Sequence, residues 1–285
     1  MAVDEQAFLG GVAVVTGAGA GIGSGIARRA GALGMMVVVT DISGERAETV
    51  AAEIRSAGGT AAAMVVDVSK PAELDRLAAE TFERFGAVRL LVNNAGIETI
   101  GNTWEIPAER WEATLNINIH GIVHGVRAFV PYMLKFGREA WIANLASIGA
   151  FGVMPTQTAY IMTKHAVQSF SECLYLELQL AKAPIHVSSV MPGMLKTSIF
   201  EASAGAGEPD SARHHRQVMF DLMKTHGMDL DEGCRLILEQ IARKQFWVST
   251  QPEMTEQALV ARMEFFRTQS PPTLAAQARQ LLGLD

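Results

Sequence analysis

The sequence predicts a doubly wound α/β fold, in which helices cover both faces of a parallel seven-stranded sheet. Three observations support this prediction. Seven short apolar runs, rich in β-branched residues, recur along the chain. Segments with helical patterning lie between them, and such alternation is typical of a parallel sheet. A glycine-rich turn follows the first run directly. Because no proline-, glycine- or serine-rich linker divides the chain, we expect residues 1–285 to form a single domain.

The strands are predicted from the length and continuity of the apolar runs, which fit strands buried on both faces. In chain order they lie at residues 12–16, 36–40, 62–66, 90–92, 141–145, 185–190 and 246–249. Helices are predicted between them, at residues 45–57, 72–85, 118–136 and 157–181. One more helix begins in the glycine-rich turn.

Residues 194–229 follow the sixth strand, where an open α/β sheet binds its ligands. This segment mixes small and polar residues with Met219, Phe220 and Met223. A plain connection would be shorter. We therefore expect a substrate loop or lid here, the alternative being a variable surface excursion. Residues 250–285 are expected to form a helical extension that breaks at Pro271 and Pro272.

Composition excludes several classes of function. The net charge is −6 and no long basic run occurs, so nucleic-acid binding has little electrostatic support. No apolar run reaches the roughly 18 residues of a membrane span. The N-terminus has no basic segment of the kind that opens a signal peptide.

Cys173 and Cys234 lack the spacing of a metal site or of a disulfide framework. We therefore expect a cytoplasmic protein in which both thiols are packed. Seven histidines form no metal motif, and His214 and His215 are expected at the surface.

The glycine-rich turn, TGAGAGIG at residues 16–23, predicts a dinucleotide site. Its spacing follows G-x-x-x-G-x-G through Gly17, Gly21 and Gly23, because Ile22 stands where G-x-G-x-x-G would need a glycine. Glycines allow the backbone, including that of Gly19, to approach a pyrophosphate, and the helix N-terminus supplies amide donors. The alternative is a glycine-rich turn without a ligand.

Asp41 ends the second strand and predicts NAD as the cofactor. A carboxylate at this position accepts hydrogen bonds from the adenosine ribose hydroxyls and repels a 2′-phosphate. Arg46 lies one helical turn further on and could compete for NADP, which is the less favoured cofactor. Asp41 could also act as the N-cap of the helix that follows.

Polar residues close the third and fourth strands as well. Asp67, followed by Val68, could bond the adenine amino group. Asn93 and Asn94, followed by Ala95 and Gly96, could tie neighbouring strand ends together, since each amide offers donors and an acceptor. Each residue alone is more often a turn residue. Their repetition at successive strand ends favours a binding site.

Tyr160 and Lys164 are candidates for proton transfer. They lie four residues apart, which places them on one face of the helix predicted at residues 157–181. A lysine ammonium beside a phenol lowers the pKa of the phenol, because positive charge favours the ionised form. A phenol tuned in this way can exchange protons near neutral pH. Ser147 precedes Tyr160 by thirteen residues, and Asn118 lies in the helix before.

Taken together, these motifs resemble those of the short-chain dehydrogenase/reductase family, in its standard single-domain form with a Rossmann-type fold. The resemblance covers about residues 10–200. The matching positions are TGAGAGIG at 16–23, Asp67, NNAG at 93–96, Asn118, Ser147, Tyr160, Lys164, Pro192, Gly193 and Thr197. One departure is Ala146, where many relatives carry a second serine.

The resemblance implies a division of roles. Tyr160 would be the general acid/base, and Ser147 would hold the substrate oxygen. Lys164 would lower the pKa of the phenol and bond the nicotinamide ribose, and Asn118 would hold a water linked to Lys164. Pro192, Gly193 and Thr197 would complete the nicotinamide site.

The same resemblance implies a redox enzyme that interconverts a secondary alcohol and a ketone. The substrate would contact Ser147, Tyr160, Glu98, Met154 and Met194. Methionines and phenylalanines around these positions predict an apolar pocket for a fairly bulky substrate. The alternatives are a 3-oxoacyl-type reductase that uses NADPH or NADH, and a non-catalytic NAD-binding sensor.

The resemblance also implies a homo-oligomer, either a dimer or a tetramer. The helices predicted at 118–136 and 157–181 carry apolar residues on more than one face, including Phe129, Tyr132, Leu174 and Leu176. A helix of this kind often buries its second face against a symmetry mate.

Overall fold

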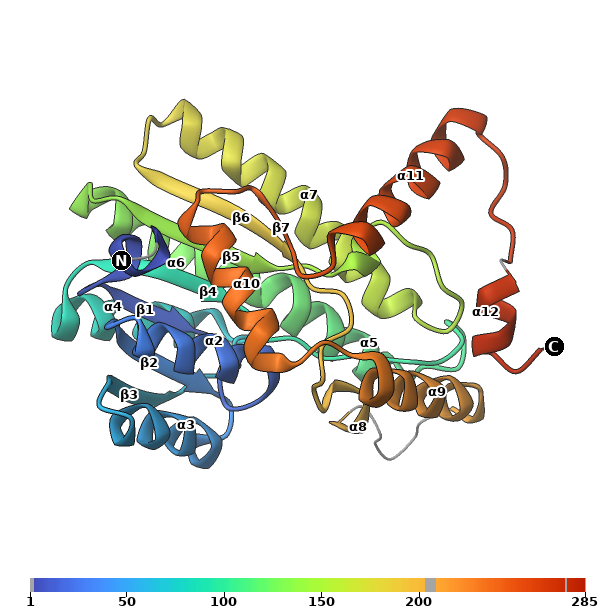
Figure 1. The fold of residues 1–285 in the computed structure, drawn as a ribbon, viewed down its shortest axis with the longest axis horizontal. Coiled ribbons are helices and arrows are strands. Elements are labelled where there is room, and N and C mark those ends of the chain that lie inside the picture. The colour runs from blue at the N-terminus through green and yellow to red at the C-terminus, as the bar shows by residue number, and fades with distance from the viewer. Residues whose placement is uncertain (1–2, 203–208, 275, 285) are drawn as a thin grey trace.

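The chain folds around one sheet of seven strands that pair in parallel. We describe it from a computed structural model that covers residues 3–202, 209–274 and 276–284 (Figure 1). The strands are β1 (Val12–Val15), β2 (Met36–Asp41), β3 (Thr60–Val65), β4 (Val88–Asn93), β5 (Ala140–Leu145), β6 (Ile185–Met191) and β7 (Trp247–Ser249). Their order across the sheet is β3-β2-β1-β4-β5-β6-β7. The predicted single-domain, doubly wound fold is confirmed.

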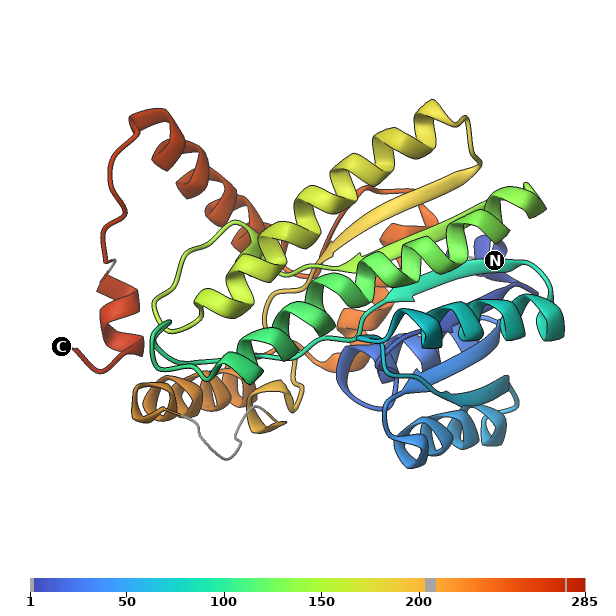
Figure 2. The same ribbon diagram turned by 180° about the vertical axis from the view of Figure 1, so that it is seen from behind.

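Helices cover both faces of this sheet. One face carries α2 (Gly21–Ala32), α3 (Gly44–Ser56) and α10 (Leu230–Ala242), seen in Figure 1. The other carries α4 (Pro71–Phe85), α6 (Gly121–Phe136) and α7 (Thr158–Leu180), seen from behind in Figure 2. The remaining helices are α1 (Val3–Phe8), α5 (Ala108–Leu115), α8 (Ile199–Ala202), α9 (Asp210–His226), α11 (Pro252–Thr268) and α12 (Ala276–Leu281).

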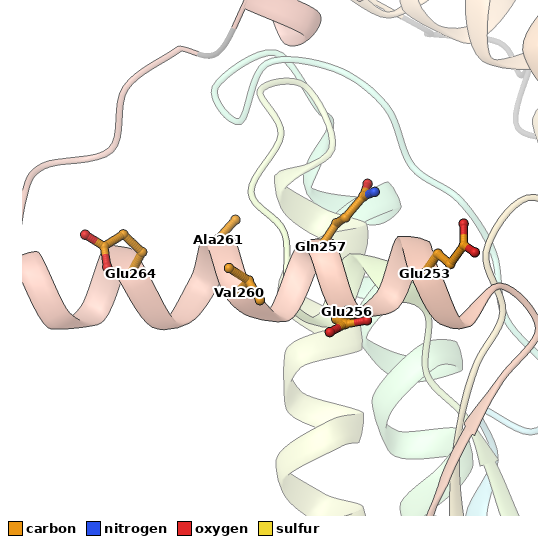
Figure 3. A pocket seen from close by; sticks show the side chains of 6 residues that line it. All are labelled: Glu253, Glu256, Gln257, Val260, Ala261 and Glu264. Atoms are coloured by element: carbon orange, nitrogen blue, oxygen red, sulfur yellow. The ribbon is translucent and has the colours of Figure 1, made fainter.

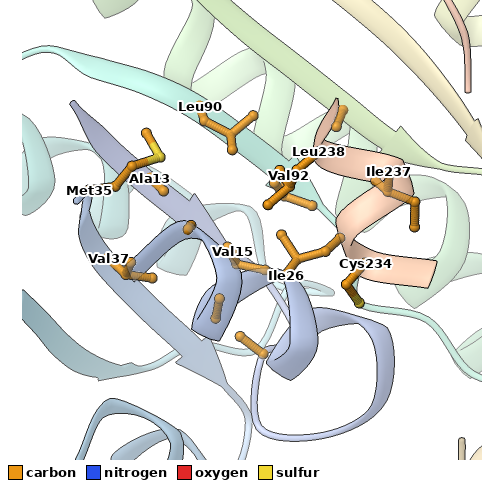
Figure 4. Close-up of a cluster of buried hydrophobic side chains, with 14 of the residues drawn as sticks. Ala13, Val15, Ile26, Met35, Val37, Leu90, Val92, Cys234, Ile237 and Leu238 are labelled. Carbon is orange, nitrogen blue, oxygen red and sulfur yellow. The ribbon is translucent and has the colours of Figure 1, made fainter. Parts of the chain in front are cut away.

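The core under α2 and α10 shows why the apolar runs become strands. Val15, Val37 and Val92 come from three neighbouring strands and are fully buried against the helices above them (Figure 4). Cys234 of α10 is packed in the same cluster, as expected. The corresponding expectation for Cys173 is wrong, because this residue lies on the exposed side of α7.

The helix predicted at 118–136 begins earlier and contains an irregular turn. α5 continues into α6 through a π-helical turn at Asn116–His120. Such single π turns often occur at functional sites. Here the Asn118 side chain bonds with the backbone of Ile97, which the periodicity of apolar residues could not reveal.

The strand order reverses between β1 and β4, and ligands bind in the crevice at such a switch point. The glycine-rich turn follows β1, Asn93 and Asn94 lie at the carboxyl end of β4, and Ser147 follows β5. The fold therefore gathers most of the predicted site along one edge of the sheet.

The extension at the C-terminus forms α11 and α12, separated at the two prolines as predicted. α11 stands away from the sheet in both views (Figures 1 and 2), and Thr255 is its buried residue. A hollow along α11 is lined by that helix alone (Figure 3), through Glu253, Glu256, Gln257, Val260, Ala261 and Glu264. None of these is a predicted site residue, and we assign this hollow no role.

The described ranges hold neither a membrane-spanning helix nor a metal-binding group of side chains. No helix there combines the length and the apolar character that a membrane span needs. No three His, Cys, Asp or Glu side chains in these ranges form a group that could hold a metal ion.

Candidate active site

The glycine-rich turn is shaped so that side chains would obstruct it. Gly17 and Gly21 have φ values of 60° and 53°, which favour glycine. A Cβ on Gly23 would lie 2.4 Å from the Gly17 carbonyl oxygen. Ala20, the N-cap of α2, gives the helix no side-chain acceptor. The turn therefore fits a bound pyrophosphate, with Gly17, Gly19, Gly21, Ile22 and Gly23 along it.

The tight packing at Gly23 gives a first prediction. Gly23→Ala should weaken binding of the dinucleotide about tenfold or more, because the added methyl group must displace the Gly17 carbonyl or the Asn94 amide. Calorimetric titration of NAD measures the effect. Gly152→Ala is the matched control, since its Cβ would approach nothing closer than 4.0 Å. Equal affinity in the two variants would contradict the placement of the pyrophosphate.

Asp41 lies beside this turn and is held by three donors. Gly19 N–H donates to its Oδ2 (3.0 Å), Ser43 N–H donates to its Oδ1 (2.9 Å), and the Arg46 guanidinium bonds the same Oδ1 at 2.6 Å. The carboxylate is buried, whereas the Arg46 side chain is 55% exposed. The alternative role of Asp41 as a helix N-cap is wrong, because Ser43 caps α3. The arrangement leaves Oδ2 with capacity to accept from a ribose hydroxyl.

Asparagines tie the strand ends together, as their position suggested. Asn94 Nδ2 donates to the carbonyls of Thr16 (2.8 Å) and Gly17 (3.1 Å). Asn93 Nδ2 donates to Asn144 Oδ1 at 2.9 Å. These bonds join the ends of β4 to β1 and β5, and so fix the crevice between them.

The neighbouring residues surround the same crevice. Ala95 packs on Gly17, whose Cβ would lie 2.8 Å from the Ala95 Cα. Gly96 lies against Lys164, since a Cβ there would be 3.7 Å from Nζ. Asp67 is engaged by Ser69, whose hydroxyl donates to its Oδ1 at 2.6 Å, and Val68 beside it is buried. Adenine binding by Asp67 stays a prediction.

Ser147, Tyr160 and Lys164 are brought together by β5 and α7. The Lys164 Nζ lies 5.3 Å from the centroid of the Tyr160 ring and donates to the Leu145 carbonyl at 2.7 Å. Ser147 follows β5, accepts from Gly149 N–H at 3.1 Å, and its side chain hydrogen-bonds the Tyr160 phenol. A phenol, a hydroxyl and an ammonium therefore lie close together.

Asn118 is fully buried in the π turn. Its Oδ1 accepts from Ile97 N–H at 2.8 Å, and its Nδ2 donates to the Ile97 carbonyl (2.9 Å) and to Thr163 Oγ1 (3.1 Å). Both amide hydrogens are thus used, and one lone pair of Oδ1 remains for a water. Asn118 joins the loop after β4 to the helix that carries Tyr160.

The electrostatics of these groups differ from the sequence expectation. Burial, and then the charge of Glu98, raise the pKa of Tyr160, whereas the bond from Ser147 lowers it. Lowering of this pKa by Lys164 stays a prediction; the ammonium lies over the face of the ring and donates to the Leu145 carbonyl. Burial lowers the pKa of Lys164 to about 8, and the charge of Glu98 opposes this shift.

The residues after β6 lie beside the glycine-rich turn. A Cβ on Gly21 would be 3.6 Å from the Thr197 side chain. Gly193 N–H donates to Thr250 Oγ1 at 3.1 Å.

Gln251 packs against these residues. It fills the space beside Gly193, and its side-chain amide donates to the Met194 carbonyl at 2.9 Å. Sequence reasoning missed Gln251, for which no motif gives a signal. Pro192, buried, and Met154, partly exposed, complete the predicted set.

The predicted lid forms α8 and α9, while residues 203–208 of that segment lie outside the described ranges. Its apolar residues pack on the loop after β4, in a cluster of Ile100, Ile199, Phe200, Ala212, Met219, Phe220 and Met223. The expected surface position of His215 is wrong. His215 is fully buried, and its Nδ1 lies 2.5 Å from Thr156 Oγ1 in the loop before α7.

Known proteins resemble this chain over most of its length. Residues 11–206 match the family described as short chain dehydrogenase. The crystal structure of a short chain dehydrogenase/reductase from Burkholderia phymatum, in complex with NAD, is 32% identical, with a TM-score of 0.89, and the match covers 93% of this chain and 97% of that one. A 1-deoxy-11-beta-hydroxypentalenate dehydrogenase of Streptomyces avermitilis is 35% identical over 187 residues, or 65% of this chain and 68% of that protein.

The protein named "Probable oxidoreductase EphD" from Mycobacterium tuberculosis is 33% identical over 222 residues, which are 75% of this chain. This match covers 37% of the length of EphD. The family match spans more than half of the 285 residues and agrees with the sheet order and the strand-end site. This chain therefore belongs to the short-chain dehydrogenase/reductase family.

Proposed function

We propose that this chain interconverts a secondary alcohol and a ketone with NAD, and that Tyr160 is the general acid/base. The observation that carries the proposal is the convergence of the Tyr160 phenol, the Ser147 hydroxyl and the Lys164 ammonium beside a glycine-rich turn. A nicotinamide, when bound, accepts or supplies the hydride. The protein has to hold the substrate oxygen and move its proton.

Each side chain has a defined part in that proton transfer. Ser147 donates a hydrogen bond to the substrate oxygen. Tyr160 Oη takes the alcohol proton during oxidation and returns it during reduction. Lys164, already fixed by the Leu145 carbonyl, presents a positive charge to the phenolate. Asn118 holds the loop after β4 against α7, so that the side chains of Ser147, Tyr160 and Lys164 keep their relative positions.

The test is the absorbance of the reduced nicotinamide, followed with a panel of secondary alcohols and their ketones. Turnover with NAD supports the proposal. The absence of turnover in both directions, in a sample that binds NAD, would favour the alternative of a non-catalytic sensor. Strong preference for 3-oxoacyl thioesters would favour the other alternative.

We propose NAD rather than NADP because Asp41 is buried and oriented at the turn by Gly19. A 2′-phosphate there would meet a carboxylate. Arg46 would support NADP, but its guanidinium is paired with Asp41.

We propose a fairly bulky, apolar substrate. Met154 lies in the loop before α7, Met194 follows β6, and Met219 and Phe220 of α9 stay partly exposed. Methionine and phenylalanine give an adaptable apolar lining. The name of the Streptomyces relative, a hydroxypentalenate dehydrogenase, agrees with this class. The lid role of residues 194–229 belongs to the same proposal.

We propose that the chain forms a homo-oligomer, a dimer or a tetramer. Most of the apolar residues on α6 and α7 pack inside the chain, Phe129 and Leu174 among them. Leu176 and Leu180, however, are 62% and 86% exposed on α7. Apolar side chains gathered in this way mark an interaction surface. A cytoplasmic location stays a prediction of the sequence.

This surface can be tested by adding charge. The double variant Leu176→Glu/Leu180→Glu should lower the molar mass measured by light scattering toward that of one chain, because an oligomer would bury the new carboxylates. Gln179→Glu adds a charge at an exposed site on the same helix and is the control. An unchanged mass in the double variant would contradict this surface.

A further inference from the structure

Glu98 is a buried carboxylate that the proposed mechanism does not use. It lies in the loop after β4, two residues beyond Gly96, and only 3% of it is exposed. The Thr99 amide and the Gln157 side chain hydrogen-bond it. Within the described ranges, its Oε1 has no hydrogen-bond partner although that atom is buried. A buried carboxylate with an unused oxygen is costly, so its presence calls for an explanation.

The surroundings of Glu98 are those of the proposed proton-transfer site. Gln157 immediately precedes α7, three residues before Tyr160. On the other side, Gly96 lies against the Lys164 ammonium. The ionisable groups that act on Glu98 or respond to it are Lys164 and Tyr160, both on α7. One cation therefore faces two groups that can each carry a negative charge.

We propose that Glu98 is a positioning residue for proton transfer, which shares a single negative charge with Tyr160 opposite Lys164. Only one of the two groups carries the charge at a time, because an ionised Glu98 keeps Tyr160 protonated and a protonated Glu98 permits the phenolate. The proposal rests on the role of Tyr160 given above.

The electrostatics of the three groups agree with this coupling. Burial raises the pKa of Glu98 to about 8, although the charge of Lys164 and the bonds from Gln157 and Thr99 oppose the rise. Burial lowers the pKa of Lys164 to about 8. An ionised Glu98 raises the pKa of Tyr160, so the phenolate is favoured only when Glu98 holds a proton.

The direct test is a titration that needs no substrate. The chain has three tyrosines, so the ultraviolet absorbance of phenolate can be assigned to Tyr160 by subtracting the same titration of Tyr160→Phe. In Glu98→Gln the Tyr160 transition should move to lower pH by about one unit or more, because a neighbouring negative charge is removed. Glu98→Asp, which keeps the charge, and Glu109→Gln, at an exposed position, should leave it in place. An unmoved transition in Glu98→Gln would overturn the proposal.

The pH profile of turnover is the second test. Removal of the Glu98 charge lowers the pKa of both Tyr160 and Lys164, so both limbs of the profile should move to lower pH in Glu98→Gln. A lower rate with an unmoved profile would mean a merely structural role and would also overturn the proposal. If the chain shows no turnover at all, the proposed function fails, yet the absorbance titration still decides whether the charge is shared.

Discussion

Replacing Tyr160 by phenylalanine should lower turnover about a thousand-fold while NAD binding changes little. The substitution removes one oxygen atom, and with it the group that accepts the proton of the substrate alcohol. It keeps the ring over which the Lys164 ammonium lies, at 5.3 Å from the centroid, so the local packing is preserved. Initial rates with the best alcohol of the panel, together with calorimetric titration of NAD, measure the two effects separately.

Tyr175→Phe provides the matched control for that experiment. Tyr175 lies on the same helix, and its ring packs edge-on against Phe246 at 5.2 Å, away from the predicted site residues. This variant should keep its activity. If Tyr160→Phe were about as active as the control, Tyr160 would not be the general acid/base. Another group would then have to accept the proton of the substrate alcohol.

Replacing Asp41 by serine should change the ratio of kcat/KM for NAD over NADP by about 10² to 10⁴ in favour of NADP. Loss of hydrogen bonds to a charged acceptor costs about 1.5–3 kcal/mol for NAD. Removal of a carboxylate that would face the 2′-phosphate relieves a repulsion of similar size for NADP. The substitution also releases the Arg46 guanidinium, now paired with Asp41 at 2.6 Å, to bind the phosphate.

A second variant separates these contributions. In Asp41→Ser/Arg46→Ala, the loss for NAD should remain while the gain for NADP becomes smaller, because the freed cation is absent. Initial rates with each cofactor at several concentrations give the ratio. A wild-type chain that already prefers NADP would contradict the part assigned to Asp41.

Much of the fold could be predicted because strands buried on both faces leave an unmistakable pattern of continuous apolar runs. Each of the seven runs became a strand, with ends that differ by at most two residues. The prediction failed where local patterning carries no signal. The short helices α1 and α5 were missed, and α5 buries only Thr114, which is not an apolar residue.

The candidate site could be predicted in part, for a similar reason. Glycines, asparagines and the Tyr160–Lys164 spacing are local features that can be read in the sequence. The burial of Glu98, the pairing of Arg46 with Asp41 and the bond from His215 to Thr156 depend on tertiary packing. The last pair is separated by 59 residues, and no spacing rule connects two such positions.

The backbone conformation of Thr156 affects which substitutions this chain can accept during evolution. Its φ of +65° is one that a β-branched residue rarely adopts, at a cost of order 1–3 kcal/mol, whereas glycine would adopt it freely. The Thr156 hydroxyl offsets that cost by bonding the buried His215. If His215 were lost, glycine would become the better residue at position 156. The two positions are therefore expected to change together, so that a homologue that lacks the histidine is expected to carry glycine in place of the threonine.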